Sequence, residues 1–133
     1  MSVSIYYSAE RGYSLTNQEK ELIKETIGKY IIGDRNKVDW RGENLNLYDY
    51  KGLETPIVLE GSVEIGNYTE DYEREIEEVV RWCYCLTDIR RNIEDLTWKV
   101  IFGDELLSYD EEIGFHMRRI PKSLHVDLKP KID

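Results

Sequence analysis

Cysteine and histidine are the side chains of this sequence that could do chemistry by themselves. Cys83 and Cys85 are its only cysteines, and they lie inside an apolar helical pattern without the second cysteine pair or nearby histidine of a zinc site. Residues at i and i+2 of a helix point in very different directions, which disfavours a disulfide between them. We therefore expect two reduced thiols in the core of a cytoplasmic protein.

The two histidines, His116 and His125, are the candidates for a general acid and a general base. Catalysis of that kind needs neighbours that fix the tautomer and the pKa of the ring, and nothing around either residue in the sequence supplies them. We interpret both as surface or strand-filling residues. A small metal-free hydrolase using His116 and a carboxylate is the least favoured function.

Carboxylate pairs are frequent, and those of 104–105 and 110–112 could bind a divalent cation if they met in a pocket. The segment 104–112 lacks the alternating oxygen ligands, central glycine and final glutamate of a calcium loop. The motifs GxGxxG, GxxxxGK, GxSxG and HExxH do not occur. The sequence therefore predicts no catalytic site, no cofactor and no metal site, and we expect a protein that is not an enzyme.

The charge of the chain is strongly negative, with 27 acidic and 18 basic residues and a formal net charge of −9. The excess lies before residue 113, because 113–133 contains more basic than acidic residues. Such a field repels nucleic acid and anionic membranes and attracts basic proteins. No apolar stretch is long enough for a membrane span. We expect a basic protein partner, no nucleic acid and no membrane.

Tyrosines stand beside carboxylates in three segments of a chain that has ten tyrosines and three tryptophans. Tyrosine covers a large contact area at little entropic cost and tolerates a wet rim, so binding surfaces favour it. The simpler interpretation is that these tyrosines complete the core. The residues that we predict to bind a partner are Asp49, Tyr50, Tyr68, Glu70, Asp71, Glu73, Tyr109, Asp110 and Glu111.

The elements that must position these residues follow from periodicity, and 133 residues suit a single domain over 1–133. A β-branched and aromatic run predicts a strand at 3–7, and the capping box of Thr16 and Glu19 predicts a helix that ends near Gly33. Strands at 45–50 and 57–65 are joined by a turn-forming stretch. We expect the tail after about 121 to be loosely held.

A second helix is predicted from Thr69, as its N-cap, to about Asn92. A strand at 97–102 follows, then short strands within 106–109 and 113–117. The order β, α, β, β, α, β with one or two C-terminal strands predicts an α+β fold. In that fold an antiparallel sheet has two helices on one face, in ferredoxin-like order.

Three segments carry a family resemblance: Ser4 to Ala9 before Leu15-Thr16, Leu47 to Tyr50, and Trp82 to Arg91 leading to Trp98. Through them the chain resembles small bacterial immunity proteins of polymorphic or contact-dependent toxin systems. The resemblance implies a protein that binds and neutralises a cognate toxin, here a basic toxin domain. It transfers no site residue, because toxin-binding positions vary with the toxin. An acidic secretion chaperone or adaptor is the alternative, and the oligomeric state stays open.

Overall fold

The computed structural model describes residues 3–31, 44–66 and 72–131. Within them the fold is α+β, with an antiparallel sheet and three α-helices, which confirms the predicted fold class at this level. The elements are β1 (Val3–Glu10), α1 (Asn17–Tyr30), β2 (Asn46–Leu47), the 3₁₀-helix η1 (Tyr50–Gly52), β3 (Ile57–Ile65), α3 (Tyr72–Asn92), β4 (Thr97–Phe102), β5 (Glu105–Leu106), β6 (Ser108–Asp110), β7 (Gly114–His116) and α4 (Lys122–Asp127).

The main sheet has the strand order β2-β3-β1-β4-β5, and each neighbouring pair is antiparallel. β1 lies at its centre, with Tyr7 opposite Gly61 of β3 and Val100 of β4. Burial alternates along β3, with Leu59, Gly61, Val63 and Ile65 turned into the core. This alternation gives the sheet one buried face and one face that meets solvent.

Tyr7 and Gly61 depend on each other at the centre of the sheet. The Tyr7 hydroxyl donates to the carbonyl oxygen of Asn46 at 2.9 Å, which carries its ring across β3 to the neighbouring strand. A Cβ atom at Gly61 would lie 2.2 Å from the Tyr7 hydroxyl and 2.2 Å from the Asn46 carbonyl oxygen. Only glycine leaves room for this arrangement.

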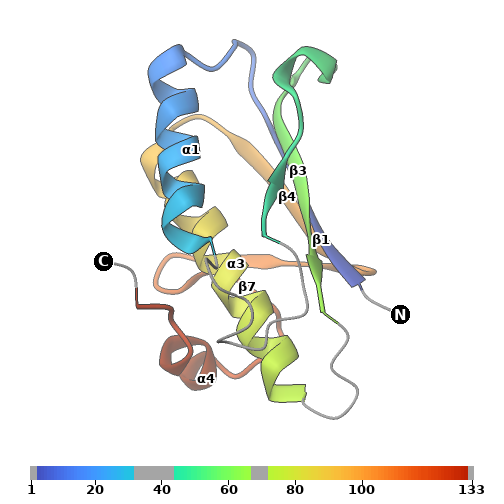
Figure 1. The fold of residues 1–133 in the computed structure, drawn as a ribbon, viewed down its shortest axis with the longest axis vertical. Helices are drawn as coiled ribbons and strands as arrows, with labels where there is room; N and C mark the ends of the chain where they lie inside the picture. The colour runs from blue at the N-terminus through green and yellow to red at the C-terminus, as the bar shows by residue number, and fades with distance from the viewer. Residues whose placement is uncertain (1–2, 32–43, 67–71, 132–133) are drawn as a thin grey trace.

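α1 and α3 pack side by side, on the left of the strands in Figure 1. α1 begins at the predicted capping box, and α3 ends at Asn92, as predicted. The middle of α3 carries the centre of the core, including Trp82, Cys83 and Cys85. No helix among the described residues combines the length and apolar composition needed to cross a membrane.

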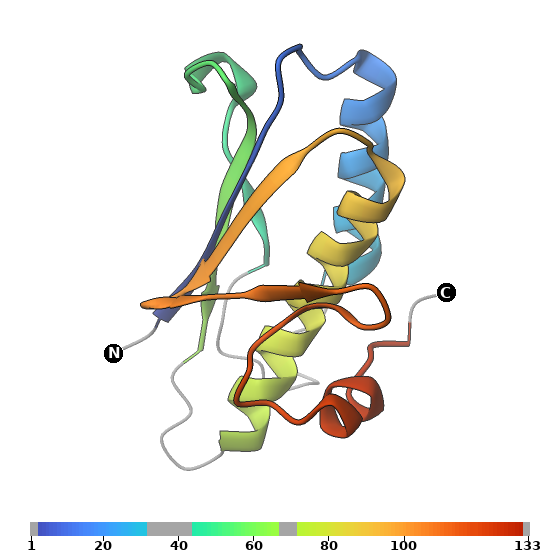
Figure 2. The same ribbon diagram turned by 180° about the vertical axis from the view of Figure 1, so that it is seen from behind.

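The C-terminal part departs from the prediction of one or two added strands. Three strands follow β4: β5 extends the main sheet, whereas β6 and β7 form a separate hairpin that packs on α3. The predicted strand 106–109 is therefore two strands in different sheets. The chain then forms α4, which the sequence analysis did not predict, below the hairpin in Figure 2.

The strand predicted at 45–50 is also wrong in length, because β2 ends at Leu47. The Asp49 carboxylate accepts a hydrogen bond from the backbone N–H of Lys51 at 3.0 Å, which turns the chain into η1. α1 ends at Tyr30, before the predicted end at Gly33. Gly33 and the predicted N-cap Thr69 lie outside the described residues.

Candidate functional site

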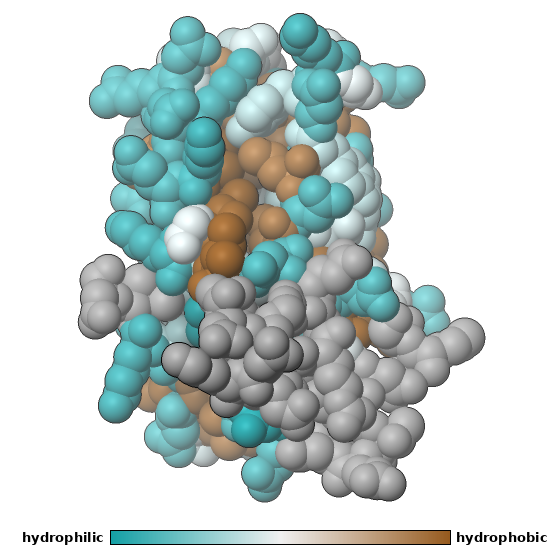
Figure 3. Space-filling model, in the orientation of Figure 1, coloured by the Kyte–Doolittle hydropathy of each residue, from teal (hydrophilic) through white to brown (hydrophobic). Residues whose placement is uncertain are grey.

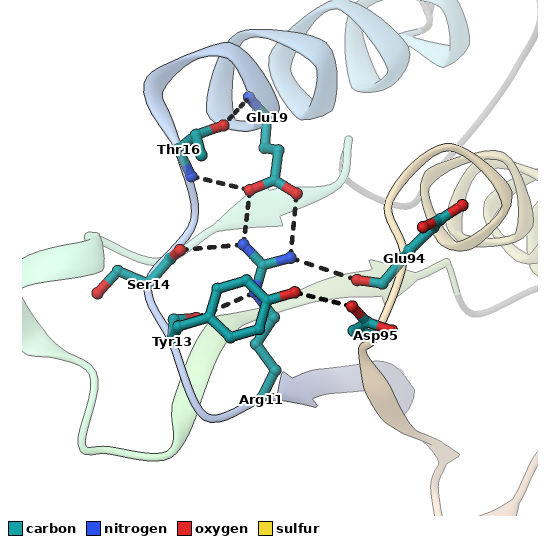
Figure 4. Close-up of polar contacts among 7 residues, drawn as sticks. All are labelled: Arg11, Tyr13, Ser14, Thr16, Glu19, Glu94 and Asp95. Atoms are coloured by element: carbon teal, nitrogen blue, oxygen red, sulfur yellow. Dashed lines mark hydrogen bonds and ion pairs between the residues drawn. The ribbon is translucent and has the colours of Figure 1, made fainter.

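Arg11 is a buried cation where β1, α1 and the end of α3 meet (Figure 4). Its two terminal nitrogens bind the Glu19 carboxylate at 2.6 and 3.0 Å, and they also donate to the carbonyl oxygens of Ser14 and Glu94 at 3.0 and 3.3 Å. Nε donates to the Tyr13 carbonyl oxygen at 3.0 Å. A guanidinium has five N–H donors, and these contacts use all of them. Arg11 therefore holds the protein together and has no donor left for a ligand.

Glu19 joins this ion pair to the start of α1. Its carboxylate accepts from the Thr16 backbone N–H at 2.8 Å, while the Thr16 hydroxyl accepts from the Glu19 N–H at 3.0 Å. This is the capping box that the sequence predicts. The hydrogen bonds from Arg11, followed by the one from Thr16, lower the pKa of Glu19 to about 2. The carboxylate stays ionised in all but strong acid.

Tyr13 covers the other side of Arg11, with the guanidinium carbon 4.1 Å from the centre of its ring. The Tyr13 hydroxyl donates to Asp95 at 2.8 Å, in the loop after α3 (Figure 4). Asp95 has a φ of 66°, a left-handed conformation that aspartate tolerates better than most residues. The Tyr13 side chain is thus exposed, but the contact of its ring with Arg11 and the hydrogen bond of its hydroxyl to Asp95 fix its position.

A cavity of about 390 Å³ opens beside this cluster, between the β1–α1 loop and η1. Tyr13, Tyr50, Leu53 and Pro56 contribute apolar surface to its walls. The Lys20 ammonium lies 4.7 Å from the centre of the Tyr50 ring. The Tyr50 hydroxyl is buried and has no hydrogen-bond partner among the described residues, and burial raises its pKa. Figure 3 shows hydrophobic surface beside the hydrophilic side chains that cover α1.

The second candidate is the outer face of the main sheet, which we define by Tyr6, Tyr48, Glu60, Ile101 and Leu106. Tyr6 stands between buried Ile5 and Tyr7, so it points away from the core, and Ile101 lies opposite both Tyr6 and Leu106. Tyr6 is 36% and Leu106 61% exposed. These side chains form an aromatic and aliphatic surface that solvent reaches.

Hydrogen bonds fix the tyrosines of the outer face. The Tyr6 hydroxyl donates to the Glu60 carboxylate, and the Tyr48 hydroxyl donates to the Ser62 Oγ at 3.0 Å. The bond to Glu60 is the main reason that the pKa of Tyr6 rises to about 12. The outer face therefore presents tyrosine rings that hydrogen bonds hold in place next to a carboxylate.

The described residues that we predicted to bind a partner lie in three separate places. Asp49 and Tyr50 are at η1, whereas Glu73 is in the first turn of α3 at the opposite end of the molecule (Figure 1). Tyr109, Asp110 and Glu111 are in the β6–β7 hairpin. The structure does not bring these three groups together. Tyr68, Glu70 and Asp71 lie outside the described residues.

The hairpin residues make internal contacts. The Tyr109 ring packs against Phe115, with centroids 5.1 Å apart, and the Arg90 guanidinium lies 3.6 Å from its centre. Asp110 accepts from the backbone N–H groups of Glu112 and Ile113, which lower its pKa and fix the turn. Glu111 is exposed, and its carbonyl oxygen accepts from Arg91 at 3.0 Å. These internal contacts explain the positions of the Tyr109 and Asp110 side chains without a binding partner.

His125 corrects the interpretation of both histidines as surface or strand-filling residues. His116 is in strand β7, but His125 is buried in α4 with its ring 4.7 Å from that of Tyr84 and 6.4 Å from that of His116. Burial, with His116 as the second cause, lowers the pKa of His125 to about 4. His125 is thus neutral at physiological pH, and it anchors α4 to the core.

The cysteines are buried free thiols, as predicted, and burial raises the pKa of Cys83 to about 12. The described residues contain no group of three or more His, Cys, Asp or Glu side chains placed to hold a metal ion. Comparison of the chain with protein-family models, curated proteins and solved structures finds no match.

Sequence reasoning missed the residues that matter most at both candidates. Tyr6 and Glu60 are 54 positions apart in the sequence, and only the sheet register brings them together. No pattern in the sequence singles out Tyr13 or Lys20. Tyr13 lies in the loop between β1 and α1, and Lys20 lies in the first turn of α1. Arg11 likewise reaches Glu94, which is 83 positions away.

Proposed function

We propose that this chain is a non-enzymatic protein-binding domain, and specifically an immunity protein that binds and neutralises a cognate basic bacterial toxin. The observation that carries the proposal is the outer face, where two tyrosines held by hydrogen bonds lie near the exposed Leu106 and the half-buried Ile101. Aromatic side chains are enriched at the centres of protein interfaces. Ordering them in advance reduces the entropy lost on binding.

The charge supports a basic partner. Glu60 is part of the outer face, and Glu64 extends from the same side of β3. The whole chain has a formal net charge of −9, so its field accelerates encounter with a cationic protein and opposes pairing with a second copy of itself. A toxin domain that acts on an anionic substrate would have the complementary surface. The proposal therefore commits to a cationic protein as the occupant of the outer face.

Two of the residues predicted from the sequence are close to this surface along the chain. Asp49 and Tyr50 follow Tyr48 directly in the chain, at the end of the sheet where η1 begins. We retain Asp49 as a rim contact, whereas Tyr50 packs against the core and the Lys20 ammonium and stays a prediction. Glu73, Tyr109, Asp110 and Glu111 stay predictions that variants in a toxin complex would test.

Two finer features belong to the same proposal. The strand order β2-β3-β1-β4, with antiparallel neighbours, supports a ferredoxin-like split βαβ arrangement with α1 and α3 on one face. The two buried, unpaired thiols support a cytoplasmic location, where a toxin-producing cell needs its protection.

Co-expression tests the proposal. The C-terminal domain encoded by the reading frame immediately upstream is expressed alone and together with this chain. We expect the domain alone to kill the cells, and co-expression to restore growth with the two proteins purifying as a complex. Failure both to restore growth and to form a complex would reject the immunity proposal.

A further inference from the structure

The Glu60 carboxylate of the outer face lies beside two tyrosine rings and has no cation of its own. It accepts a hydrogen bond from the Tyr6 hydroxyl, but it forms no ion pair with any residue of the described chain. We propose that Glu60 and the rings of Tyr6 and Tyr48 bind an arginine side chain of the cationic partner. This inference rests on the proposed function, because it names the side chain with which that partner occupies the outer face.

The sheet register places the two rings on opposite sides of strand β3. Tyr6 lies opposite Ser62 on β1, and its hydroxyl reaches Glu60. On the other side, the Tyr48 N–H donates to the Glu60 carbonyl oxygen at 2.9 Å, and the Tyr48 hydroxyl reaches the Ser62 Oγ at 3.0 Å. The rings therefore flank a short stretch of β3 in which Ser62 is small and Glu60 carries a negative charge.

A side chain of another protein can reach this carboxylate. Tyr6 is 36% exposed, and Tyr48 and Glu60 are half-buried. Tyr6 donates to Oε2 of Glu60, whereas Oε1 receives no hydrogen bond within the described chain and meets solvent. The two oxygens of a carboxylate offer about four acceptor sites, so the bond from Tyr6 leaves most of them open.

A guanidinium fits this arrangement better than an ammonium does. It is planar, it donates two parallel hydrogen bonds to a carboxylate, and it stacks on the faces of aromatic rings. An ammonium is a compact and strongly hydrated charge, so it gains less from the rings. The hydrogen bond between Tyr6 and Glu60 holds one ring and the carboxylate in place, which reduces the entropy lost when the arginine binds.

The neighbouring charges leave Glu60 available to a cation from outside the chain. Lys99 lies opposite Ser8, which in turn lies opposite Glu60. Two strand spacings, about 10 Å in all, therefore separate Lys99 from Glu60. No ion pair joins these two side chains in the described structure. Glu64, on the same side of β3, adds a second negative charge to the surface that the partner approaches.

A small arginine derivative tests the site without a toxin. The probe is N-acetyl-arginine methylamide, and the comparison compounds are its lysine and citrulline analogues. Citrulline has nearly the shape of arginine but no charge. Each compound is titrated at constant ionic strength into the isotope-labelled full chain, and ¹H–¹⁵N NMR follows the backbone amides of Tyr6, Glu60 and Ser62.

We expect saturable shifts of these amides with the arginine compound, at the roughly 10–100 mM concentrations typical of a single side chain. The lysine compound should bind about threefold more weakly or worse, and the citrulline compound should give no saturable shift. Lysine binding as tight as arginine binding would overturn the assignment to arginine. Equal shifts with arginine and citrulline, or no saturable arginine shift up to about 200 mM, would overturn the site itself.

Two variants locate the binding. Glu60→Gln keeps an acceptor oxygen for the Tyr6 hydroxyl and removes the charge, so it should abolish the saturable shift with arginine. Tyr48→Leu removes one ring and should weaken binding by about threefold or more. The matched control is Glu10→Gln, an exposed carboxylate at the end of β1, which should bind like the wild type. Unchanged arginine binding by a folded Glu60→Gln variant would also overturn the proposal.

The co-expression experiment separates this inference from the proposed function. Cells protected by the chain, together with an outer face that does not distinguish arginine from citrulline, would reject the arginine site alone. Arginine selectivity at Glu60 without protection or a complex would reject the immunity proposal alone.

Discussion

The Tyr6 hydroxyl donates a hydrogen bond to the Glu60 carboxylate across the two central strands, on the side of the sheet turned away from the core. The pair fixes an aromatic ring in the middle of a solvent-facing surface and sets a negative charge beside it. Neighbouring Ile101 and Leu106 extend the surface with aliphatic side chains. This local arrangement is the basis for assigning a protein partner to the outer face.

The Tyr7–Gly61 contact predicts a large penalty for a single methyl group. Gly61→Ala should lower the free energy of unfolding by about 2–3 kcal/mol, because the new Cβ displaces either the Tyr7 ring or the β2 backbone. Chemical denaturation measures the change. Gly28→Ala is the matched control: its Cβ would meet no atom within 4 Å, and inside α1 it should stabilise the protein by roughly 0.5–1 kcal/mol. Equal effects of the two substitutions would contradict the packing described.

The Arg11–Glu19 pair predicts strong coupling between two residues. Arg11→Met should cost about 3 kcal/mol, because the Arg11 side chain is 2% exposed and its loss leaves three carbonyl oxygens and a carboxylate without their donor. Glu19→Gln should cost less, since solvent reaches that side chain. A double-mutant cycle measured by denaturation should give a coupling of about 1–2 kcal/mol. Additive effects would show that the pair contributes nothing beyond its separate residues.

Glu19 also predicts part of the acid sensitivity. Its pKa is about 2 in the folded protein against an ordinary 4.5, so the unfolded chain binds the proton first as the pH falls. The stabilisation is complete above about 4.5 and is lost as the pH falls towards 2. The difference in unfolding free energy between the wild type and Glu19→Gln should therefore shrink across that interval. A difference that stays constant from pH 5 to pH 2 would contradict the low pKa.

His125 predicts a pH dependence in a higher window. Its pKa is lowered from 6.5 to about 4, so the unfolded chain again takes up the proton first. Stability from the neutral ring should fall by roughly 2–3 kcal/mol between pH 6.5 and pH 4 and then level off. His125→Phe keeps a ring against Tyr84 and should remove this dependence. Parallel curves for the wild type and the variant over that window would contradict the buried neutral histidine.

The parts of the fold that local chemistry determines could be predicted from the sequence. β3 and β4 match their predicted ranges, because alternation defines β3 and a β-branched and aromatic run followed by a turn defines β4. The start of α1 follows from the Thr16 and Glu19 cap. The end of β2 could not be predicted, because the Asp49 side chain captures the Lys51 N–H and competes with strand pairing.

Tertiary packing determines the helix α4 and the long-range contacts at the candidate sites, which could not be predicted from the sequence. α4 has six residues, too few for an isolated helix, and the buried His125 ring holds it against Tyr84. At the candidate sites, Tyr6 meets Glu60 and Arg11 meets Glu94 only after the sheet register and the end of α3 are fixed. The tyrosine and acid pattern predicted a binding surface, but neighbours in the chain could not show which rings share a face.

The outer face gives the most direct test of the account: the affinity of a Tyr6→Ala/Leu106→Ser variant for the purified toxin domain that the immunity proposal expects the reading frame immediately upstream to encode. The matched control is Tyr72→Ala/Val126→Ser, which removes an exposed tyrosine and an exposed aliphatic side chain that are 57% and 49% exposed elsewhere. Circular dichroism and denaturation establish that both variants are folded before titration calorimetry measures the dissociation constants.

We expect the outer-face variant to bind at least about 30-fold more weakly than the wild type, since truncation of central aromatic contacts costs more than about 2 kcal/mol. The control should bind within about twofold of the wild type, because rim and non-interface positions contribute little. A folded outer-face variant that binds the toxin domain as tightly as the wild type would contradict the assignment of this surface.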